Sequence, residues 1–492
     1  MSPDKGGTHM EQLSIGKNGP SIRVLSDEQV REIHIASLTI LEDIGIDLRE
    51  HEALDLLVSR GATEGSSGRL RIPQRLVQGA LSTVPRHIPL YTRTGELTLP
   101  LYAGRIYFGT GSDTIYTRDI ETGERRNPTR QDIRRIATLV DALPNLSFVM
   151  SMGTVWDAPS ADNYIHTFIE MLRGSLKPIV FTAKDRRDIE HIWRIATTVS
   201  GGERELREKP FLLHYSEPIS PLLFTDESVQ KLLFCAEKNI PVTYCPSPNM
   251  GAGGPVTMAG ALAQANAETL GGMVIAQLKN PGCPYLYGAN VAVFDMRTTV
   301  ISYGAPEWSL SMAALADMSR FYGLPVWGTS GATDSKLVDA QAGLEAMQSV
   351  YTAFLSRCTL NHDVGYIESG LTSSMEMIIL VDEIISMVRY IGEGISVTPG
   401  TLALDAIRRV KPGSGYLTDD HTLDYWRKAL FIPKLLNRER FENWIAAGGS
   451  GMFARLNQTA REILAHHRVQ PLSKDTERAI AAVFEERKIL IG

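Results

Sequence analysis

The chain contains 492 residues and weighs 54.2 kDa, a length that suits one large barrel or several smaller domains. Hydrophobic residues make up 43% of the chain and charged residues 22%, which excludes disordered, collagen-like and disulfide-scaffold proteins. The formal net charge of -6 leaves no basic excess for a phosphate backbone, so we expect no nucleic acid as a partner.

The cysteines and the N-terminal residues indicate the cellular compartment of the protein. The four cysteines lie far apart without a CxxC pair, which favours reduced thiols over a disulfide framework or a zinc ribbon. The first twelve residues, MSPDKGGTHMEQ, are polar where a signal peptide needs an apolar stretch, and no window reaches the ~20 apolar residues of a membrane span. We therefore expect a cytoplasmic protein with no membrane partner.

The chain opens with helical patterns. Residues 26–60 carry apolar side chains at helical spacing behind Ser26, a suitable N-cap, and residues 72–85 predict another helix. Residues 90–104 alternate and contain glycine, which is typical of a hairpin. We assign residues 1–100 to an N-terminal helical segment and hairpin.

Eight short apolar runs follow, each with a helical stretch behind it. They begin near residues 105, 147, 177, 211, 241, 284, 325 and 361. Such continuous runs are typical of strands buried on both faces of a parallel sheet. Eight of these units predict an α/β fold, a (β/α)8 TIM-type barrel over residues 101–391, with an open doubly wound sheet as the alternative. Residues 392–492 are predicted to form a C-terminal helical cap.

In such a barrel, functional side chains belong at the carboxyl ends of the strands, where the connecting loops meet. Aromatic residues concentrate there, and ring faces attract cations. Packing in the core is the alternative for each of them. The candidates for a cation-binding cage are Tyr107, Phe108, Tyr215, Tyr244, Tyr287 and Trp327.

Glycine loops and metal pairs give weaker signals. Gly253 and Gly254 precede Pro255 at an expected helix start, so their free N–H groups could bind a carboxylate or phosphate, or the loop could be a tight turn. The run FGTGSD at 108–113 resembles a nucleotide-binding loop, but strand alternation follows it where a helix is required. The pairs His362 with Asp363 and His421 behind Asp420 lack a third ligand, so we expect no metal site.

Three separated motifs resemble one known family. They are PVTMAGALAQANAE (255–268) with LYGAN (286–290), TDSKLVDAQAGLE (333–345) and LTDDHTLDYWRKALFIPKLLNRERFENW (417–444). Together they resemble the trimethylamine methyltransferase family, in particular its branch without pyrrolysine, which includes glycine betaine:corrinoid methyltransferases. The resemblance implies a (β/α)8 barrel that moves a methyl group from an amine to cob(I)alamin, free or on a partner corrinoid protein. It implies no tightly bound cofactor.

The family's trimethylamine-specific members carry pyrrolysine in the stretch matching Thr329 to Lys336. This chain has Ser330, Gly331 and Ala332 there, and all of its residues are standard. A quaternary nitrogen has no lone pair to protonate and leaves as a neutral amine, whereas a tertiary amine needs activation first. The resemblance therefore implies a quaternary amine as methyl donor, glycine betaine giving dimethylglycine ahead of proline betaine or carnitine.

Such a donor needs a cage for its cation and a clamp for its carboxylate. Arg297 could pair with the carboxylate through two hydrogen bonds and His362 could donate one, although an ion pair or a core histidine would explain each equally well. No catalytic side chain is identified. Another barrel enzyme, such as a lyase or a thiol-dependent demethylase, and a non-catalytic betaine-binding protein are alternatives. Barrels of this size often associate, so a homo-oligomer is one expected state.

Overall fold

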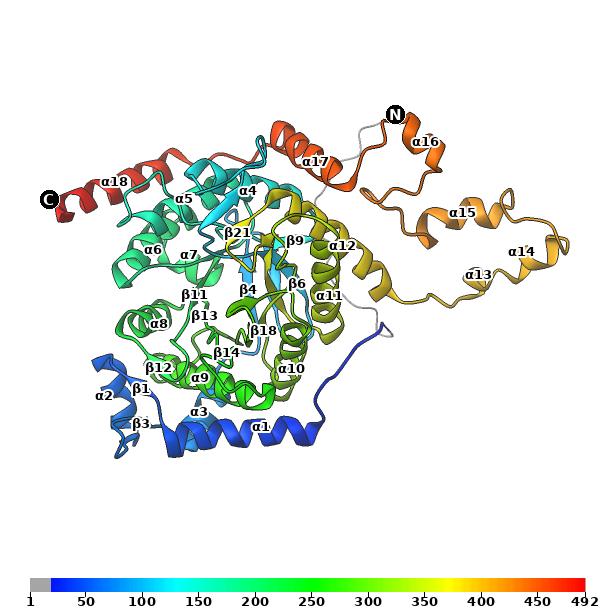
Figure 1. The fold of residues 1–492 in the computed structure, drawn as a ribbon. Coiled ribbons are helices and arrows are strands. Elements are labelled where there is room, and N and C mark those ends of the chain that lie inside the picture. The colour runs from blue at the N-terminus through cyan, green and yellow to red at the C-terminus, as the bar shows by residue number, and fades with distance from the viewer. Residues whose placement is uncertain (1–18, 492) are drawn as a thin grey trace.

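The computed structural model of the chain describes residues 19–491, so the polar segment MSPDKGGTHMEQ lies outside the described residues. A ring of eight parallel strands stands at its centre (Figure 1). The strands are β6 (Tyr107–Thr110), β9 (Leu146–Phe148), β10 (Ile179–Phe181), β11 (Leu212–Ser216), β13 (Val242–Tyr244), β15 (Tyr285–Gly288), β18 (Val326–Thr329) and β19 (Leu360–Val364).

The ring closes. Strand β19 pairs with β6, β6 pairs with β9, and a parallel bridge between Val149 and Ile179 joins β9 to β10. Each strand lies in one of the eight predicted runs. The predicted (β/α)8 barrel is therefore confirmed, and the open doubly wound sheet is excluded.

Helices surround the ring. They are α4 (Arg130–Ala142), α5 (Asn163–Gly174), α6 (Arg186–Ser200) with the short α7 (Glu203–Glu208), α8 (Asp226–Lys238), α9 (Met258–Lys279), α10 (Pro306–Tyr322), α11 (Ala340–Ser356) and α12 (Met375–Glu393). Small residues in α9 admit large strand side chains, since a Cβ on Gly272 would lie 2.5 Å from the Tyr244 ring. Side-chain caps begin several helices, as Ser374 does for α12.

The N-terminal segment covers one side of the barrel and one of its ends. Helices α1 (Asp27–Thr39), α2 (His51–Ser59) and α3 (Gln74–Thr83) pack against α9, with the π-helical turn η1 (Ile40–Ile44) and the short strands β1 (Asp47–Leu48), β2 (Thr63–Glu64), β3 (Leu70–Arg71) and β12 (Leu223–Phe224) beside them. The predicted hairpin forms from β4 (Ile88–Tyr91) and β5 (Leu97–Leu101). Its Tyr91 N–H donates to the Pro210 carbonyl (2.9 Å), just before β11, so the hairpin lies at the amino ends of the strands.

Two small sheets rim the opposite end, which we call the mouth. One contains β14 (Asn249–Met250), β16 (Ala292–Asp295) and β17 (Val300–Ser302). The other contains β7 (Tyr116–Arg118), β8 (Arg125–Arg126), β20 (Tyr366–Ile367) and β21 (Thr372–Ser373). Both are built from the connections that follow barrel strands, so they surround the carboxyl ends.

The chain beyond α12 is helical, and it takes two courses. Residues 394–428, which we call the arm, project from the barrel and contain α13 (Pro399–Leu402), α14 (Leu404–Arg409) and most of α15 (Asp420–Ala429) (Figure 1). After α16 (Phe441–Ala446), α17 (Met452–His466) packs on α12 and α4, and α18 (Lys474–Ile491) packs on α6. Within residues 19–491, no helix combines the length and the apolar character needed to cross a bilayer.

Candidate functional site at the mouth of the barrel

Three aromatic rings meet inside the barrel near its carboxyl end. The ring centroids of Tyr215 and Trp327 lie 5.4 Å apart, those of Trp327 and His362 4.6 Å, and those of Tyr215 and His362 5.9 Å. Strand β11 is separated from β18 by two other strands, so rings from both can touch only if they point into the interior. The rings contact one another and form one continuous wall, which offers a ligand a single aromatic face.

A chain of hydrogen bonds crosses the mouth from this wall. The Tyr215 hydroxyl donates to Oε2 of Glu217 (3.1 Å) and accepts from Nδ2 of Asn290 (3.2 Å). The Thr329 hydroxyl donates to Oδ1 of Asn290 (3.1 Å) and lies 3.3 Å from Nδ1 of His362. Side chains from β11, the loop after β15, β18 and β19 are therefore held in one network, which fixes the orientation of each.

Burial favours the neutral forms of both His362 and Asp363. Burial lowers the pKa of His362 to about 4 and raises the pKa of Asp363 to about 8. Nδ1 of His362 lies 2.9 Å from the Gly328 carbonyl, which can only accept, so Nδ1 carries the hydrogen. The lone pair on Nε2 then faces Oδ1 of Asp363 at 3.2 Å, and a protonated Asp363 donates to it.

The backbone at Asp363 is strained. Its φ of +77° is in the left-handed region, and the register of β19 against β6 shifts between Asn361 and Val364. Aspartate and asparagine tolerate this region better than other side chains that carry a Cβ. The irregularity ends the strand and turns the carboxyl toward the His362 ring.

Four side chains at the mouth are accessible to solvent and yet have pKa values that burial shifts. Glu217 is exposed, and Asp113, Tyr215 and Tyr303 are partly exposed. Even so, the surrounding protein desolvates all four, and this burial raises the pKa of each. Groups that solvent reaches but that protein surrounds lie on the wall of a recess, because an outer surface would leave them hydrated.

The recess carries more acidic than basic groups. Asp113 accepts hydrogen bonds from Ser151 Oγ (2.9 Å) and Thr182 Oγ1 (3.0 Å), and its charge also acts on Glu217. Lys231 Nζ donates to the Ala183 carbonyl (2.8 Å), and burial lowers its pKa although Glu217 opposes the shift. Two carboxyl groups facing one ammonium group favour a cationic ligand. We use "mouth cluster" for Asp113, Tyr215, Glu217, Lys231, Asn290, Tyr303, Trp327, Thr329, His362 and Asp363.

The loop of small residues after β18 borders this cluster. The Ser330 N–H donates to the His362 carbonyl (2.9 Å), and Oγ of Ser330 is buried without a hydrogen-bond partner in the described structure. Gly331 has a φ of +80°, and a Cβ there would lie 3.0 Å from the Val381 side chain. Ala332 is buried beside it. The loop thus touches the cluster through its backbone and presents no long side chain at Ser330 to Ala332.

Other predicted cage residues lie elsewhere. Tyr244 shares a hydrogen bond with Ser228 of α8 (2.8 Å), and Tyr287 donates to Asn266 of α9 (2.9 Å). Their rings therefore fill the space between the barrel and its helices.

Two more predicted cage residues belong to the first barrel strand. A Cβ on Gly109 would touch Phe148, whose ring lies 6.2 Å from Trp327 inside the barrel. The adjacent Phe108 therefore points outward, and it is fully buried. Tyr107 opens the strand at its amino end, next to the charge of Arg105. The structure brings neither side chain to the mouth cluster.

The residues predicted to clamp the carboxylate also lie in different places. Arg297 has 88% of its side chain exposed and pairs with Asp295 (3.1 Å) in the β16–β17 turn. Helix α9 begins at Met258, after the glycines, and the Gly254 N–H is already bonded to the Asn249 carbonyl (3.1 Å). Of the clamp candidates, the structure joins only His362 to the mouth cluster and leaves Gly253, Gly254 and Arg297 outside it.

Several mouth residues were not predicted. Glu217 directly follows the apolar run 211–216, and a carboxylate at a strand end is a signal that could have found it. Asp113 ends the FGTGSD run, which drew attention only as a nucleotide loop. Tyr303 follows β17, and nothing in the sequence indicates that this small sheet turns it toward the mouth.

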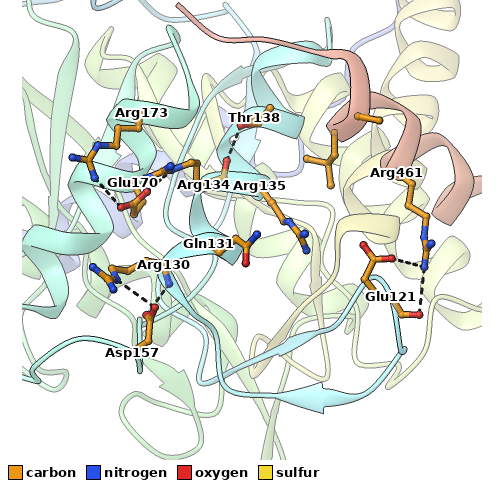
Figure 2. Close-up of a pocket in the computed structure, with 12 residues that line it drawn as sticks. Glu121, Arg130, Gln131, Arg134, Arg135, Thr138, Asp157, Glu170, Arg173 and Arg461 are labelled. Carbon is orange, nitrogen blue, oxygen red and sulfur yellow. Dashed lines mark hydrogen bonds and ion pairs between the residues drawn. The ribbon is translucent and has the colours of Figure 1, made fainter. Parts of the chain in front are cut away.

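A hollow of about 760 Å³ on the outside of the barrel is a different feature (Figure 2). Its arginines lie on α4, α5 and α17, and acidic side chains neutralise most of them: Arg130 pairs with Asp157, Arg134 and Arg173 with Glu170, and Arg461 with Glu121. Of these pairs, the one between Arg461 and Glu121 joins α17 to the barrel. Within residues 19–491, no group of three or more His, Cys, Asp or Glu side chains could hold a metal ion.

A closed barrel whose accessible polar groups gather at the carboxyl ends of the strands is the architecture of a (β/α)8 barrel enzyme. Residues 4–492 match the family model described as trimethylamine methyltransferase. The chain belongs to this family.

Two named relatives are similar to this chain over nearly its whole length. The chain is 29% identical to the trimethylamine methyltransferase of Desulfitobacterium hafniense DCB-2, covering 97% of this chain and 96% of the relative. It is 30% identical to the glycine betaine methyltransferase of Desulfitobacterium hafniense Y51, covering 97% and 100%. The monomethylamine methyltransferase structure of Methanosarcina barkeri aligns over 92% of this chain and 96% of that one, with 12% identity and a TM-score of 0.46.

Proposed function

We propose that this protein takes a methyl group from a quaternary amine, with glycine betaine as the leading donor, and transfers it to the Co(I) form of a corrinoid, free or carried by a partner protein. The observation that carries the proposal is the recess at the mouth, where tyrosine rings and two carboxyl groups are both accessible and desolvated. A permanent cation gains from ring faces and from nearby carboxylates in such surroundings.

The proposed methyl transfer requires the protein mainly to position the substrate. The methyl carbon loses its bond to nitrogen, and the bonding electron pair stays on nitrogen, which leaves as a neutral tertiary amine. The new bond uses the electron pair of Co(I), so no proton moves in the step. The side chains at Ser330 to Ala332 are small, and this supports a donor that needs no activation at the nitrogen. The mouth cluster has to orient the methyl group and exclude water.

Lys231 is the basic member of the mouth cluster, and it gives the betaine carboxylate a partner. The mouth cluster thus offers carboxyl groups for the cationic end of a betaine and an ammonium group for its anionic end. Arg297, which points to solvent beside Asp295, does not serve this role. Proline betaine and carnitine carry the same two charges, so they are the donors to compare.

The decisive experiment mixes the purified protein with reduced cobalamin and one amine at a time. We expect glycine betaine to produce methylcobalamin, followed by absorbance, and trimethylamine to produce none. A response to trimethylamine alone would overturn the proposal.

Two further outcomes separate the alternatives. Betaine that binds in a calorimeter without any methyl transfer would identify a binding protein. Dimethylglycine formed with a thiol in place of cobalamin would identify a demethylase. Proline betaine and carnitine, tested in parallel, rank the donors by kcat/KM.

A further inference from the structure

The arm is built from helices that bury almost nothing in their own chain. Of residues 394–428, only Ala406 is buried. Large apolar side chains are exposed along its whole length, from Ile395 (92%) to Leu417 (84%) and Leu423 (61%). A helical segment gains most of its stability from packing an apolar face, so this arm needs a surface to cover it.

Both ends of the arm are fixed. Helix α12, from which it departs, packs on the barrel, and on the returning side the Glu383 carboxylate of α12 accepts from the Lys434 N–H (3.0 Å). The Tyr390 hydroxyl donates to the Ala429 carbonyl (2.6 Å), next to the end of α15. The arm is therefore an excursion between two anchored points, and it projects in a defined direction (Figure 1).

The arm is also shaped internally. Arg409 pairs with Asp419 (2.9 Å), and the rings of His421 and Tyr425 stack at 4.5 Å. The first contact joins the end of α14 to the start of α15, and the second lies within α15. They leave the apolar side chains outside, so the arm presents a preformed apolar surface.

We propose that the arm is an exchange element that packs against the barrel of a second copy of this chain, while the arm of that copy packs against this barrel. In a two-fold dimer both copies contribute the same surfaces. The arm of each copy therefore needs an apolar surface on the barrel of the other copy. The outer faces of α10 and α11 carry such a surface. Leu310 of α10 (45% exposed) and Leu344 of α11 (73% exposed) project there, and a hydrogen bond from Gln348 to Ser309 (3.3 Å) joins the two helices.

Area and charge both favour a second copy. Taking ~150 Å² for a fully exposed large side chain, the exposed apolar residues of the arm offer on the order of 800 Å². A standard interface buries about that much on each partner, and an exchange uses two arms. The arm carries five basic and four acidic residues, so its charge offers nothing to a polyanion. Apolar area with balanced charge is typical of contacts between subunits.

The first test measures mass in solution on the full chain. We expect the wild-type protein to be a dimer, of twice 54.2 kDa, or a multiple of that dimer, at micromolar concentration in light scattering or sedimentation. The double variant L417E/L423E should shift the species to monomer, and L310E/L344E should do the same from the receiving side. The matched control Val58→Glu, a half-exposed apolar residue on α2, should leave the mass unchanged.

A crosslinking test remains informative if the charged variants fail to fold. All four cysteines are buried, so an introduced surface cysteine is the reactive thiol. Chains carrying Leu417→Cys and chains carrying Leu344→Cys are refolded or co-expressed together and treated with a short bis-maleimide. We expect a crosslinked product of two chains that requires both variants.

Three results would overturn the proposal. They are a wild-type monomer at tens of micromolar, a dimer that both charged variants leave intact, and a monomer that associates only when a corrinoid-carrying protein is added. None of them bears on methyl transfer by the mouth cluster, so this inference and the proposed function fail separately.

Discussion

The barrel mouth and the arm differ in the surroundings that they give to polar and apolar side chains. At the mouth, polar and titratable groups are surrounded by protein and joined to one another, as in the series from Glu217 through Tyr215 to Asn290. In the arm, apolar groups such as Ile395 and Leu417 are surrounded by solvent. Each arrangement costs free energy in the isolated chain, and each is explained if a ligand or a second subunit completes it.

The largest effect we expect concerns Asp363. Its pKa of about 8 in the folded protein lies far above the ordinary value of 3.8, so the folded state holds a proton that the unfolded state has lost. Stability therefore decreases as pH rises from about 4 to about 8, by on the order of 5 kcal/mol at the full shift. Asp363→Asn keeps a donor toward His362 and cannot ionise, so it should unfold at higher temperature than wild type at pH 8 and match it near pH 4.

Thermal unfolding of both proteins from pH 4 to pH 9 measures this difference. Asp363→Ala is the companion variant, because it loses the donor as well and should not gain stability. Parallel pH profiles for wild type and Asp363→Asn would contradict the raised pKa.

A cavity-forming substitution tests how firmly the barrel wall is packed. Leu360 of β19 is fully buried in the barrel wall, and Leu360→Ala should lower the free energy of unfolding by about 2–5 kcal/mol. The measurement is chemical denaturation with an unchanged m-value. A loss below 1 kcal/mol would mean that the barrel wall repacks easily, which would weaken the view that it is a fixed frame for the recess.

Substitution of Glu217 separates function from stability. Because Glu217 is exposed within the recess and neutralises a cation there in the proposed reaction, Glu217→Gln should lower kcat/KM for betaine about 100-fold, ~2.7 kcal/mol. Its melting temperature should stay within a degree or two of wild type. The exposed Glu227→Gln on α8 is the matched control and should leave both unchanged. Equal activity in the two variants would remove Glu217 from the site.

The sequence predicts the frame better than the site, and particular residues show why. Strands such as Val326–Thr329 are continuous apolar runs, and their number and spacing suffice for a closed barrel. Side-chain direction alternates along each strand, however, so an error of one residue exchanges interior and exterior. Trp327 and Tyr215 point inward, whereas Tyr244 and Tyr287 point to the helices, and composition at strand ends does not distinguish them.

Contacts between distant segments are the second limit. Tyr303 reaches the mouth because β16 and β17 form a sheet with β14, which lies more than forty residues earlier in the chain. The arm contains amphipathic helices such as α15 (Asp420–Ala429). Local periodicity predicts such helices, but it does not show that their apolar side chains stay exposed in the described chain. The spacing of apolar residues in a sequence predicts the apolar face of a helix. Only the folded structure shows which surface, if any, packs against that face.

The smallest effect that we expect tests whether a second copy of the chain covers the apolar side chains of the arm. Leu417→Ala removes a side chain that is 84% exposed in the single chain, so in a monomer it should change stability by no more than about 0.5 kcal/mol. In an arm-exchanged dimer the same side chain is covered, and its loss should weaken association instead, with a dissociation constant several-fold higher by sedimentation. The melting temperature would then fall in dilute samples more than in concentrated ones, because dissociation precedes unfolding. A melting temperature that is independent of concentration in both proteins would show that nothing covers Leu417.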